Sequence, residues 1–256
     1  MRADGAAMTA LSENLERLEE VIGQACLAAG RSRGDVELMA VSKTYPAEKV
    51  VEAAELGLRL FGENRVQEFA GKADGLKDWR AEGMIAAEDA PVLVHLIGHL
   101  QSNKAARAVE LFDAVDSVDS LKLAERLNDA AAKLGKRLPI LIEVKLSPEE
   151  TKAGLEPESD EAAQLLERLP DLHHLHAQGL MTIAPSGVAE EETRACFRSL
   201  RTWRDAWAAH HPKLSLDVLS MGMSGDFAIA IEEGATRIRI GTALFGKRAL
   251  WTGDPE

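Results

Sequence analysis

One lysine in this sequence is positioned to react with an aldehyde. Lys43 ends the mostly apolar segment VELMAVSK, residues 36–43, which has the composition of a buried strand. An amine at the end of such a strand is partly desolvated, and desolvation favours the neutral form over the ammonium. A neutral amine condenses with an aldehyde to form a Schiff base. Taken alone, Lys43 is better interpreted as a surface lysine that buries only the stem of its side chain. A second feature is needed to favour the reactive interpretation.

Two glycine-containing segments near the C-terminus supply that feature. The segment SMGMSG, residues 220–225, follows a predicted strand and opens a helical pattern in which Ser224 is placed as the N-cap. Backbone N–H groups at a helix N-terminus bind phosphate. The segment RIGT, residues 239–242, follows the next strand, where Gly241 lets the backbone approach closely and Thr242 adds a hydroxyl. Either segment alone fits an ordinary turn or a structural arginine, but both in this order favour a phosphate site, because (β/α)8 barrels often build one after strands seven and eight.

An amine that reacts with aldehydes beside a phosphate site suits two classes of ligand. One is pyridoxal 5′-phosphate (PLP), and the other is a phosphorylated sugar in a Schiff-base aldolase. Arg239 favours PLP, because an arginine facing the pyridine nitrogen would keep that nitrogen unprotonated and weaken the ring as an electron sink.

The elements that must position these residues alternate regularly along the chain. Apolar segments typical of strands cover residues 36–43, 59–64, 92–98, 111–118, 138–146, 172–183, 214–222 and 236–242. Helical patterns cover residues 9–29, 46–56, 65–79, 102–109, 119–134, 157–169, 190–210 and 225–233, and residues 80–90 are predicted to form a loop. Such alternation predicts parallel strands, and eight units predict closure into a barrel.

The predicted fold is therefore α/β, a single (β/α)8 TIM-type barrel over residues 9–250 with an extra N-terminal helix. Flexible tails are predicted at residues 1–8 and 251–256, and no C-terminal β domain is expected. A doubly wound open sheet is the alternative, but it normally has a Gly-rich turn after its first strand, and the sequence there is SKTYP.

Composition narrows the classes of function. The chain has 256 residues and a formal net charge of −12, which opposes general nucleic-acid binding. No apolar stretch approaches the ~20 residues of a membrane span, and the N-terminus lacks the apolar core of a signal peptide. Cys26 and Cys196 have neither disulfide-framework nor zinc-site spacing. We expect a cytoplasmic, monomeric protein without nucleic-acid or membrane partners and without a metal.

Seven sequence blocks, in order between about residue 10 and residue 248, resemble the signature blocks of the PLP homeostasis protein family (YggS/PROSC-like). They are VELMAVSKT, FGENRVQE, HLIGHLQSNK, ETKAG, GLMTI, SMGMSGDF and RIRIGTALFG. That family in turn resembles the barrel domain of fold-type III PLP enzymes such as alanine racemase. The resemblance implies a protein that binds, buffers and delivers PLP, with PLP-dependent apo-enzymes as recipients and without strong catalytic activity.

The resemblance also implies roles for individual residues. Lys43 would carry the cofactor as a Schiff base, Ser224 and the backbone of Gly241 and Thr242 would hold its phosphate, and Arg239 would face the pyridine nitrogen. Asn64 would line the pocket near the ring. The complete predicted cofactor site is Lys43, Asn64, Ser220, Met223, Ser224, Arg239, Gly241 and Thr242.

A fold-type III PLP-dependent amino-acid racemase or lyase is the alternative function. The racemases resembled here bring a tyrosine base to the cofactor from a C-terminal β domain, whereas Tyr45 is the one tyrosine in this sequence. Tyr45 stands two residues after Lys43 and is predicted to cover the pocket. A second acid or base opposite Lys43, which racemisation needs, is not evident in the sequence.

Several other polar residues have a structural and a functional interpretation. Lys145 stands where the resembled family usually has asparagine, and would either add positive charge near Lys43 or lie on the rim. Lys152 is either a second amine for cofactor transfer or a solvated loop lysine. Asp116 and Asp119 are predicted to be a strand end and a helix N-cap rather than a catalytic pair. The histidines of the HHLH segment, residues 173–176, are predicted to be structural or surface residues rather than metal ligands.

Overall fold

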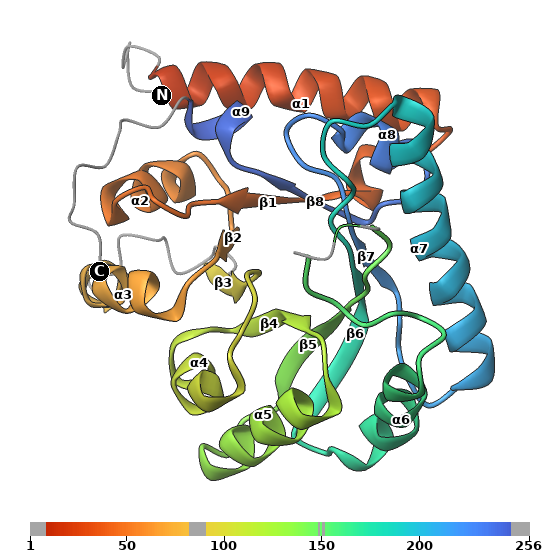
Figure 1. The fold of residues 1–256 in the computed structure, drawn as a ribbon. Helices are drawn as coiled ribbons and strands as arrows, with labels where there is room; N and C mark the ends of the chain where they lie inside the picture. The colour runs from red at the N-terminus through yellow and green to blue at the C-terminus, as the bar shows by residue number, and fades with distance from the viewer. Residues whose placement is uncertain (1–8, 82–90, 148, 150–151, 247–256) are drawn as a thin grey trace.

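The computed structural model describes residues 9–81, 91–147, 149 and 152–246 (Figure 1). The predicted tails at residues 1–8 and 251–256 lie outside this part of the chain, as does most of the predicted loop at residues 80–90. Within it, the strands pair in chain order to form one closed barrel. This confirms the predicted barrel and excludes the open sheet.

The eight barrel strands are all parallel and mostly short. They are β1 (Glu37–Val41), β2 (Leu60–Glu63), β3 (Leu93–Leu96), β4 (Ala114–Val118), β5 (Leu138–Glu143), β6 (Leu175–Met181), β7 (Val218–Ser220) and β8 (Arg237–Ile240). Closure pairs β1 with β8, so that Met39 lies opposite Arg239. The first and last strands of the sequence therefore present their carboxyl ends side by side, which brings Lys43 near the RIGT segment.

The helices surround the barrel (Figure 1). In the described part of the chain, the α-helices are α1 (Ala10–Ala28), α2 (Ala47–Glu55), α3 (Val66–Ala81), α4 (Ala105–Leu111), α5 (Leu121–Lys133), α6 (Asp160–Arg168), α7 (Glu190–His210), α8 (Phe227–Glu232) and α9 (Thr242–Phe245). Short 3-10 helices cover Arg33–Asp35, Ser102–Lys104 and Leu169–Asp171. None of these helices combines the length and the apolarity that crossing a membrane requires.

The additional helix α1 packs against α8 and α9, next to the closure of the barrel. Its apolar positions recur every three or four residues, and Leu11, Leu18 and Ile22 are buried. The Thr9 hydroxyl caps the helix by accepting a hydrogen bond from the backbone N–H of Ser12 at 3.2 Å. This amphipathic helix therefore covers the part of the barrel where the last strand pairs with the first.

The core is mainly aliphatic, as the low aromatic content of 4% predicts. It also contains a line of paired charges. Asp116 on β4 lies 3.0 Å from His95 Nδ1 and 3.2 Å from Arg237, and Arg237 reaches Glu37 at 2.7 Å. Buried charges require such partners. Asp116 is therefore a structural residue in the middle of a strand, and not the strand end that the sequence suggests.

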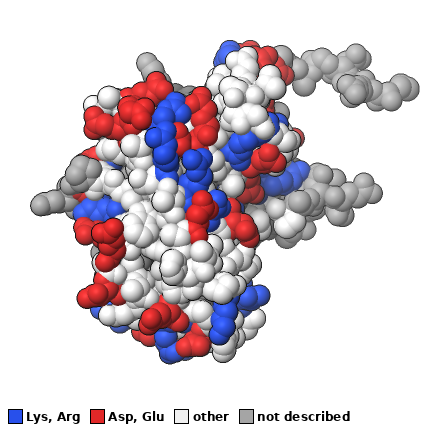
Figure 2. All heavy atoms as spheres, turned by 90° about the vertical axis from the view of Figure 1, so that its right-hand side faces the viewer, with Lys and Arg blue, Asp and Glu red and all other residues white. Residues whose placement is uncertain are grey.

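On the face covered by α7, a narrow stripe of basic side chains is flanked by acidic side chains (Figure 2). Arg194 pairs with Glu232 at 2.7 Å, and Arg198 pairs with Glu233 at 2.9 Å. In this view no broad basic surface of the kind that binds a phosphate backbone is seen.

Two predicted helix caps are wrong: at α5 the neighbouring Ser120 makes the capping bond, and α8 has no side-chain cap bond at its N-cap, Asp226. Helix α5 is capped by Ser120, whose hydroxyl accepts from Leu123 N, whereas Asp119 instead accepts from His99 at 3.0 Å. Helix α8 begins after Asp226 and not after Ser224. The predicted strand at residues 214–222 shortens to β7, residues 111–113 do not belong to a strand, and helix α9 was not predicted.

Candidate functional site

A cavity of about 480 Å³ opens at the carboxyl ends of the strands. Seven of the eight predicted site residues line it: Lys43, Asn64, Met223, Ser224, Arg239, Gly241 and Thr242. The eighth, Ser220, lies outside the lining and contacts Arg239. The loops after β1, β2, β7 and β8 thus converge on one site, as expected for the functional end of a barrel.

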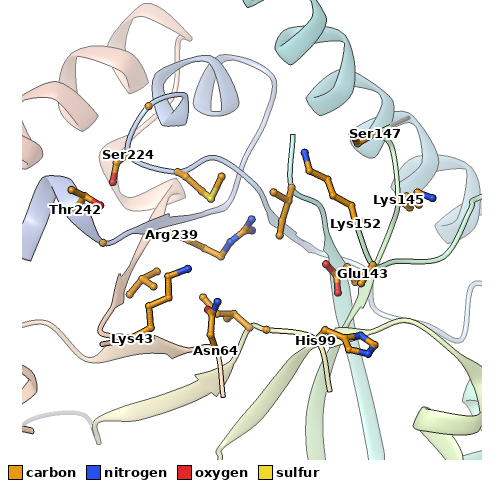
Figure 3. Close-up of a pocket in the computed structure, with 18 of the residues that line it drawn as sticks. Lys43, Asn64, His99, Glu143, Lys145, Ser147, Lys152, Ser224, Arg239 and Thr242 are labelled. Atoms are coloured by element: carbon orange, nitrogen blue, oxygen red, sulfur yellow. The ribbon is translucent and has the colours of Figure 1, made fainter. Parts of the chain in front are cut away.

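Lys43 follows β1 by two residues and extends into the cavity (Figure 3). The segment before it is fixed by buried polar contacts. The Ser42 hydroxyl donates to Glu63 Oε1 at 2.8 Å, and Lys72 Nζ donates to the Ser42 carbonyl and to Glu63, both at 2.9 Å. Because Glu63 is fully buried, these contacts hold the end of β1 rigidly beneath Lys43.

The backbone turns sharply directly after Lys43. Thr44 has φ of 68°, in the left-handed region that β-branched residues rarely adopt. The Thr44 amide donates to the Glu68 carboxylate, which also lies 3.1 Å from Lys72 Nζ. Strain of this kind persists only where the surroundings determine the conformation, so the turn that directs Lys43 is held by side chains of α3.

Tyr45 covers one edge of the cavity, as predicted. Its hydroxyl donates to the Gly246 carbonyl at 2.8 Å, and its ring lies 4.8 Å from the ring of Phe245. The loop after β1 is thereby tied to the C-terminal end of α9. The hydroxyl is engaged in a structural hydrogen bond at the rim of the site.

Arg239 is held rigidly in the wall of the cavity. Its side chain is almost fully buried, and Nη1 donates to the Ser220 carbonyl at 2.7 Å and to the Ser220 hydroxyl at 2.9 Å. Nη2 donates to the Thr182 carbonyl at 2.8 Å. Burial lowers the pKa of Arg239 below its ordinary value, while the carboxylates of Asp116 and Glu143 oppose that shift. The guanidinium nevertheless stays charged in a protein, so the wall carries a fixed cation.

The loops after β7 and β8 form a single structure. The Ser224 hydroxyl accepts from the backbone N–H of Ala243 at 3.3 Å, which joins one loop to the other. The Met223 amide donates to Asp226 at 2.5 Å. Gly222 has φ of 91°, and a Cβ there would lie 2.6 Å from the Cβ of Ala230. Glycine is therefore required for this loop to fold back against α8 and present Ser224 to the cavity.

Gly241 brings the backbone close to β1. A Cβ at this position would lie 3.3 Å from the Val41 carbonyl oxygen, which is tighter than most contacts. Gly241 is followed by Thr242, the first residue of α9, so hydroxyls and backbone amides of two loops face the same end of the cavity. Such a cradle has the donors that a phosphate requires.

Glu143 is a cavity residue that the sequence interpretation missed. It is the last residue of β5, its side chain is directed into the cavity (Figure 3), and only 5% of the residue is exposed. Its Oε2 atom is buried and has no hydrogen-bond partner among the residues that the structure describes. Burial raises the pKa of Glu143 to about 7, Asp119 adds to the shift, and Arg239 opposes it. The sequence marks this residue only as a glutamate within the apolar segment LPILIEVKL. At the end of a barrel strand, such a glutamate can point either into the barrel or outward.

Lys145 and Lys152 line the cavity farther from Lys43. Lys145 has its amine turned away from the cavity centre and 3.9 Å from Glu156, so it lies on the rim rather than beside Lys43 (Figure 3). Lys152 donates to the Ala184 carbonyl at 2.7 Å and pairs with Glu149 at 2.8 Å. Lys152 is therefore a largely buried, bonded residue and not a solvated loop lysine.

The histidines of residues 173–176 lie away from this site. His174 Nδ1 is 3.1 Å from the Lys136 carbonyl, a contact at the opposite end of β5. In the described ranges, no group of three or more His, Cys, Asp or Glu side chains is arranged to hold a metal ion.

Known proteins that resemble this chain belong to the family that the sequence blocks predict. Residues 8–249 match the family described as alanine racemase, N-terminal domain. The pyridoxal phosphate homeostasis protein of Aquifex aeolicus is 42% identical over 236 residues, covering 92% of this chain and 97% of that protein. The protein of the same name from Escherichia coli K12 is 38% identical over 243 residues, covering 94% and 98%.

Solved structures show the same fold. PipY of Synechococcus elongatus PCC7942, with PLP bound, superposes with a TM-score of 0.79 at 41% identity, covering 92% of this chain and all of PipY. Alanine racemase from Clostridium difficile superposes with a TM-score of 0.69 at 17% identity, over 57% of its own chain. At that identity the likeness concerns the barrel alone.

Proposed function

Because the chain belongs to the pyridoxal phosphate homeostasis proteins, within the alanine racemase N-terminal domain family, we propose that it binds PLP and holds it as a Schiff base on Lys43. The observation that carries this proposal is the convergence of Lys43, Arg239 and the β7 and β8 loops on one cavity. When bound, PLP supplies an aldehyde for amines and an electron-withdrawing ring.

The residues present fit this cofactor. Ser224, Thr242 and the backbone at Gly241 would hold the phosphate, and the close approach to Val41 at Gly241 provides a cradle that a side chain would fill. Arg239 would face the pyridine nitrogen, with Ser220 fixing its guanidinium. Asn64 and Met223 would line the ring, and Lys43 Nζ would carry the aldehyde carbon.

We propose that the protein buffers PLP and delivers it to PLP-dependent apo-enzymes, without strong catalysis of its own. Racemisation needs two groups that exchange protons on opposite faces of the substrate. The Tyr45 hydroxyl is committed to the Gly246 carbonyl, which leaves it poorly placed for that role. The names of the relatives, which refer to homeostasis, also support a carrier.

The alternative is a fold-type III amino-acid racemase or lyase. One observation favours it: Glu143 lies in the cavity with a pKa of about 7, the range suited to a general base. Exchange of the α-hydrogen of L-alanine with D2O separates the two functions. We expect no exchange above the rate with free PLP, whereas fast exchange that E143Q abolishes would establish the enzyme.

The cytoplasm is the proposed compartment, and a monomer the proposed state. Both cysteines are free and buried, as suits a reducing compartment. In the described part, the exposed large hydrophobic residues are Val21 and Leu27 on α1, Leu56 after α2, Leu93 on β3 and Leu134 after α5, so no single element carries them all. Light scattering at several concentrations tests the monomer directly.

The site is tested by the absorbance spectrum of the protein with added PLP, followed by borohydride reduction and peptide mapping. We expect a yellow protein that carries the reduced label on Lys43. The K43A variant should not be labelled there, and the matched control K145A, which removes another cavity lysine, should be labelled like the wild type. A wild type that takes up no PLP would overturn the proposal and leave a phosphosugar aldolase as the better interpretation.

A further inference from the structure

Glu143 is an ionisable group in the cavity to which the carrier function gives no role. It closes β5 on the wall opposite Ser224 and Thr242, and its carboxyl group is directed into the open space (Figure 3). Only 5% of the residue is exposed, and within the described ranges its buried Oε2 atom has no hydrogen-bond partner. A buried acceptor without a donor costs free energy, so a ligand that supplies a donor at this atom would be stabilised.

The charged groups around Glu143 have other partners. Arg239 on β8 donates to Ser220 and Thr182. Asp119, after β4, accepts from His99, which follows β3. After β5, Lys145 is directed to Glu156 and Lys152 bonds Ala184 and Glu149. Lys43 enters the cavity from the opposite side, after β1.

Among the described residues that line the cavity, Glu143 is the one acid. The other ionised groups there are lysines and an arginine, which suit anions such as a phosphate. Within this lining, Glu143 is therefore the group that can bind a cation. A phosphate held by the β7 and β8 loops would offset the positive charge of Lys43 and Arg239. Among organic cations, an ammonium group is compact and supplies three donors.

We propose that Glu143 is the receptor for the ammonium group of a small amine or amino acid, which occupies the part of the cavity between Glu143 and Lys43. This inference deepens the proposed function and rests on it, because PLP would fill the end of the cavity nearer Ser224 and Thr242. An amine held there lies within the cavity that Lys43 enters, so the site would bring an amine-bearing metabolite next to the bound cofactor.

The test uses protein whose PLP has been fixed by borohydride reduction, so that added amines cannot displace it. Methylammonium, glycine and acetate are titrated separately by calorimetry at pH 8. We expect methylammonium and glycine to bind and acetate not to bind. The E143Q variant, which keeps the shape and removes the charge, should bind methylammonium at least tenfold more weakly. The control E156Q, at an exposed glutamate on the same rim, should bind like the wild type.

The pH dependence gives a second readout from the wild type alone. Because burial raises the pKa of Glu143 to about 7, its carboxylate is mostly protonated at pH 6 and mostly ionised at pH 8. Methylammonium should therefore bind several-fold more tightly at pH 8. The other ionisable groups that face Glu143 are Arg239, Asp119, His99 and Lys145. The E143Q variant retains all four, so it provides the reference curve.

Each outcome has a distinct meaning. Equal affinity of wild type and E143Q for methylammonium, or binding of acetate in place of methylammonium, would overturn the ammonium site. If E143Q does not fold, as judged by circular dichroism, E143D and the wild-type pH dependence decide instead. Tighter binding of glycine than of methylammonium identifies amino acids as the ligand class, and equal binding identifies simple amines. A missing label on Lys43 would refute the PLP proposal alone, and the same titrations on unlabelled protein would then decide the ammonium site.

Discussion

Lys72 Nζ lies 2.9 Å from Glu63 Oε1 and next to Ser42, the residue that precedes Lys43. Glu63 is fully buried, and the side chain of Lys72 is 11% exposed. The same ammonium group also donates a hydrogen bond to the Ser42 carbonyl, so it is a structural group of the barrel wall rather than a surface charge. This pair therefore connects helix α3 to the strand end from which the proposed reactive lysine extends.

Replacing Lys72 by methionine should be strongly destabilising, because it leaves a buried carboxylate without its counter-ion. Breaking a buried pair on one side costs about 3–5 kcal/mol. Burial already raises the pKa of Glu63, and removing Lys72 should raise it further, so the loss should be larger at pH 8 than at pH 5. Urea unfolding at both pH values measures this difference.

The surface pair of Lys49 and Glu52 provides the control. The two groups are 2.6 Å apart but both are partly exposed, so K49M should cost no more than about 1 kcal/mol. If K72M and K49M lose equal stability, the buried pair does not have the role given to it here.

Thr44→Gly should be tolerated, although it removes a side chain next to the site. Thr44 has φ of 68°, which costs an L-residue roughly 1–2 kcal/mol, while glycine adds about 0.5–1 kcal/mol of unfolded-state entropy. The two effects partly cancel, and the hydrogen bond from the Thr44 amide to Glu68 is retained. We expect the free energy of unfolding to stay the same or to rise by about 1 kcal/mol.

Thr202→Gly, at an exposed position inside helix α7, is the comparison. There the backbone is helical, and because threonine is itself a weak helix former, glycine should cost only about 0.3–0.5 kcal/mol. A larger loss for T44G than for T202G would mean that the Thr44 side chain stabilises the turn, contrary to the strain argument.

The barrel and most of the cavity could be predicted from the sequence because both follow from local patterns. Alternating apolar segments determine strand order, and closure then brings Lys43 and Arg239 to neighbouring strands, since Met39 pairs with Arg239. Residues that follow successive strands reach the same rim without any knowledge of side-chain contacts. For this reason seven of the eight predicted site residues line one cavity.

What the sequence did not predict depends on competition between distant side chains. Asp119 and Ser120 are both good N-caps, and Ser120 caps α5 because His99, twenty residues earlier, contacts Asp119. Glu143 was missed because a glutamate ending an apolar strand is compatible with an outward or an inward orientation. Its unsatisfied oxygen is evident only once the surrounding partners are placed.

Glu143→Gln should stabilise the cofactor-free protein at neutral pH but not at acid pH. Burial raises the pKa of Glu143 from 4.5 to about 7, so the folded state binds a proton that the unfolded state releases. A raised carboxyl pKa gives stability that is fully present below about pH 4.5 and is lost as pH rises towards 7. At about 1.4 kcal/mol for each pH unit, the wild type loses on the order of 3 kcal/mol over this range.

The E143Q variant has no proton to lose, so its stability relative to the wild type should rise between pH 4.5 and pH 7.5. Urea unfolding of both proteins over this range measures the difference, in which the contributions of the other titrating groups cancel. A constant difference between the two proteins would show that folding does not raise the pKa of Glu143.

Gly98→Ala should damage both the fold and the cavity. A Cβ at Gly98 would lie 2.3 Å from the Asn64 carbonyl oxygen and 2.9 Å from Asn64 Cα, and backbone atoms cannot move aside as a flexible side chain can. The ends of β2 and β3 would have to separate, which should cost about 3 kcal/mol or more. Because Asn64 lines the cavity, the same displacement should weaken PLP binding, as measured by equilibrium dialysis.

Gly23→Ala in helix α1 is the control, because a Cβ added at Gly23 would have no neighbouring atom of the described residues within 4 Å. This substitution should raise the free energy of unfolding by about 0.5–1 kcal/mol and leave PLP binding unchanged. A G98A protein with normal stability and normal PLP affinity would show that the contact between Gly98 and Asn64 is not required to form the site.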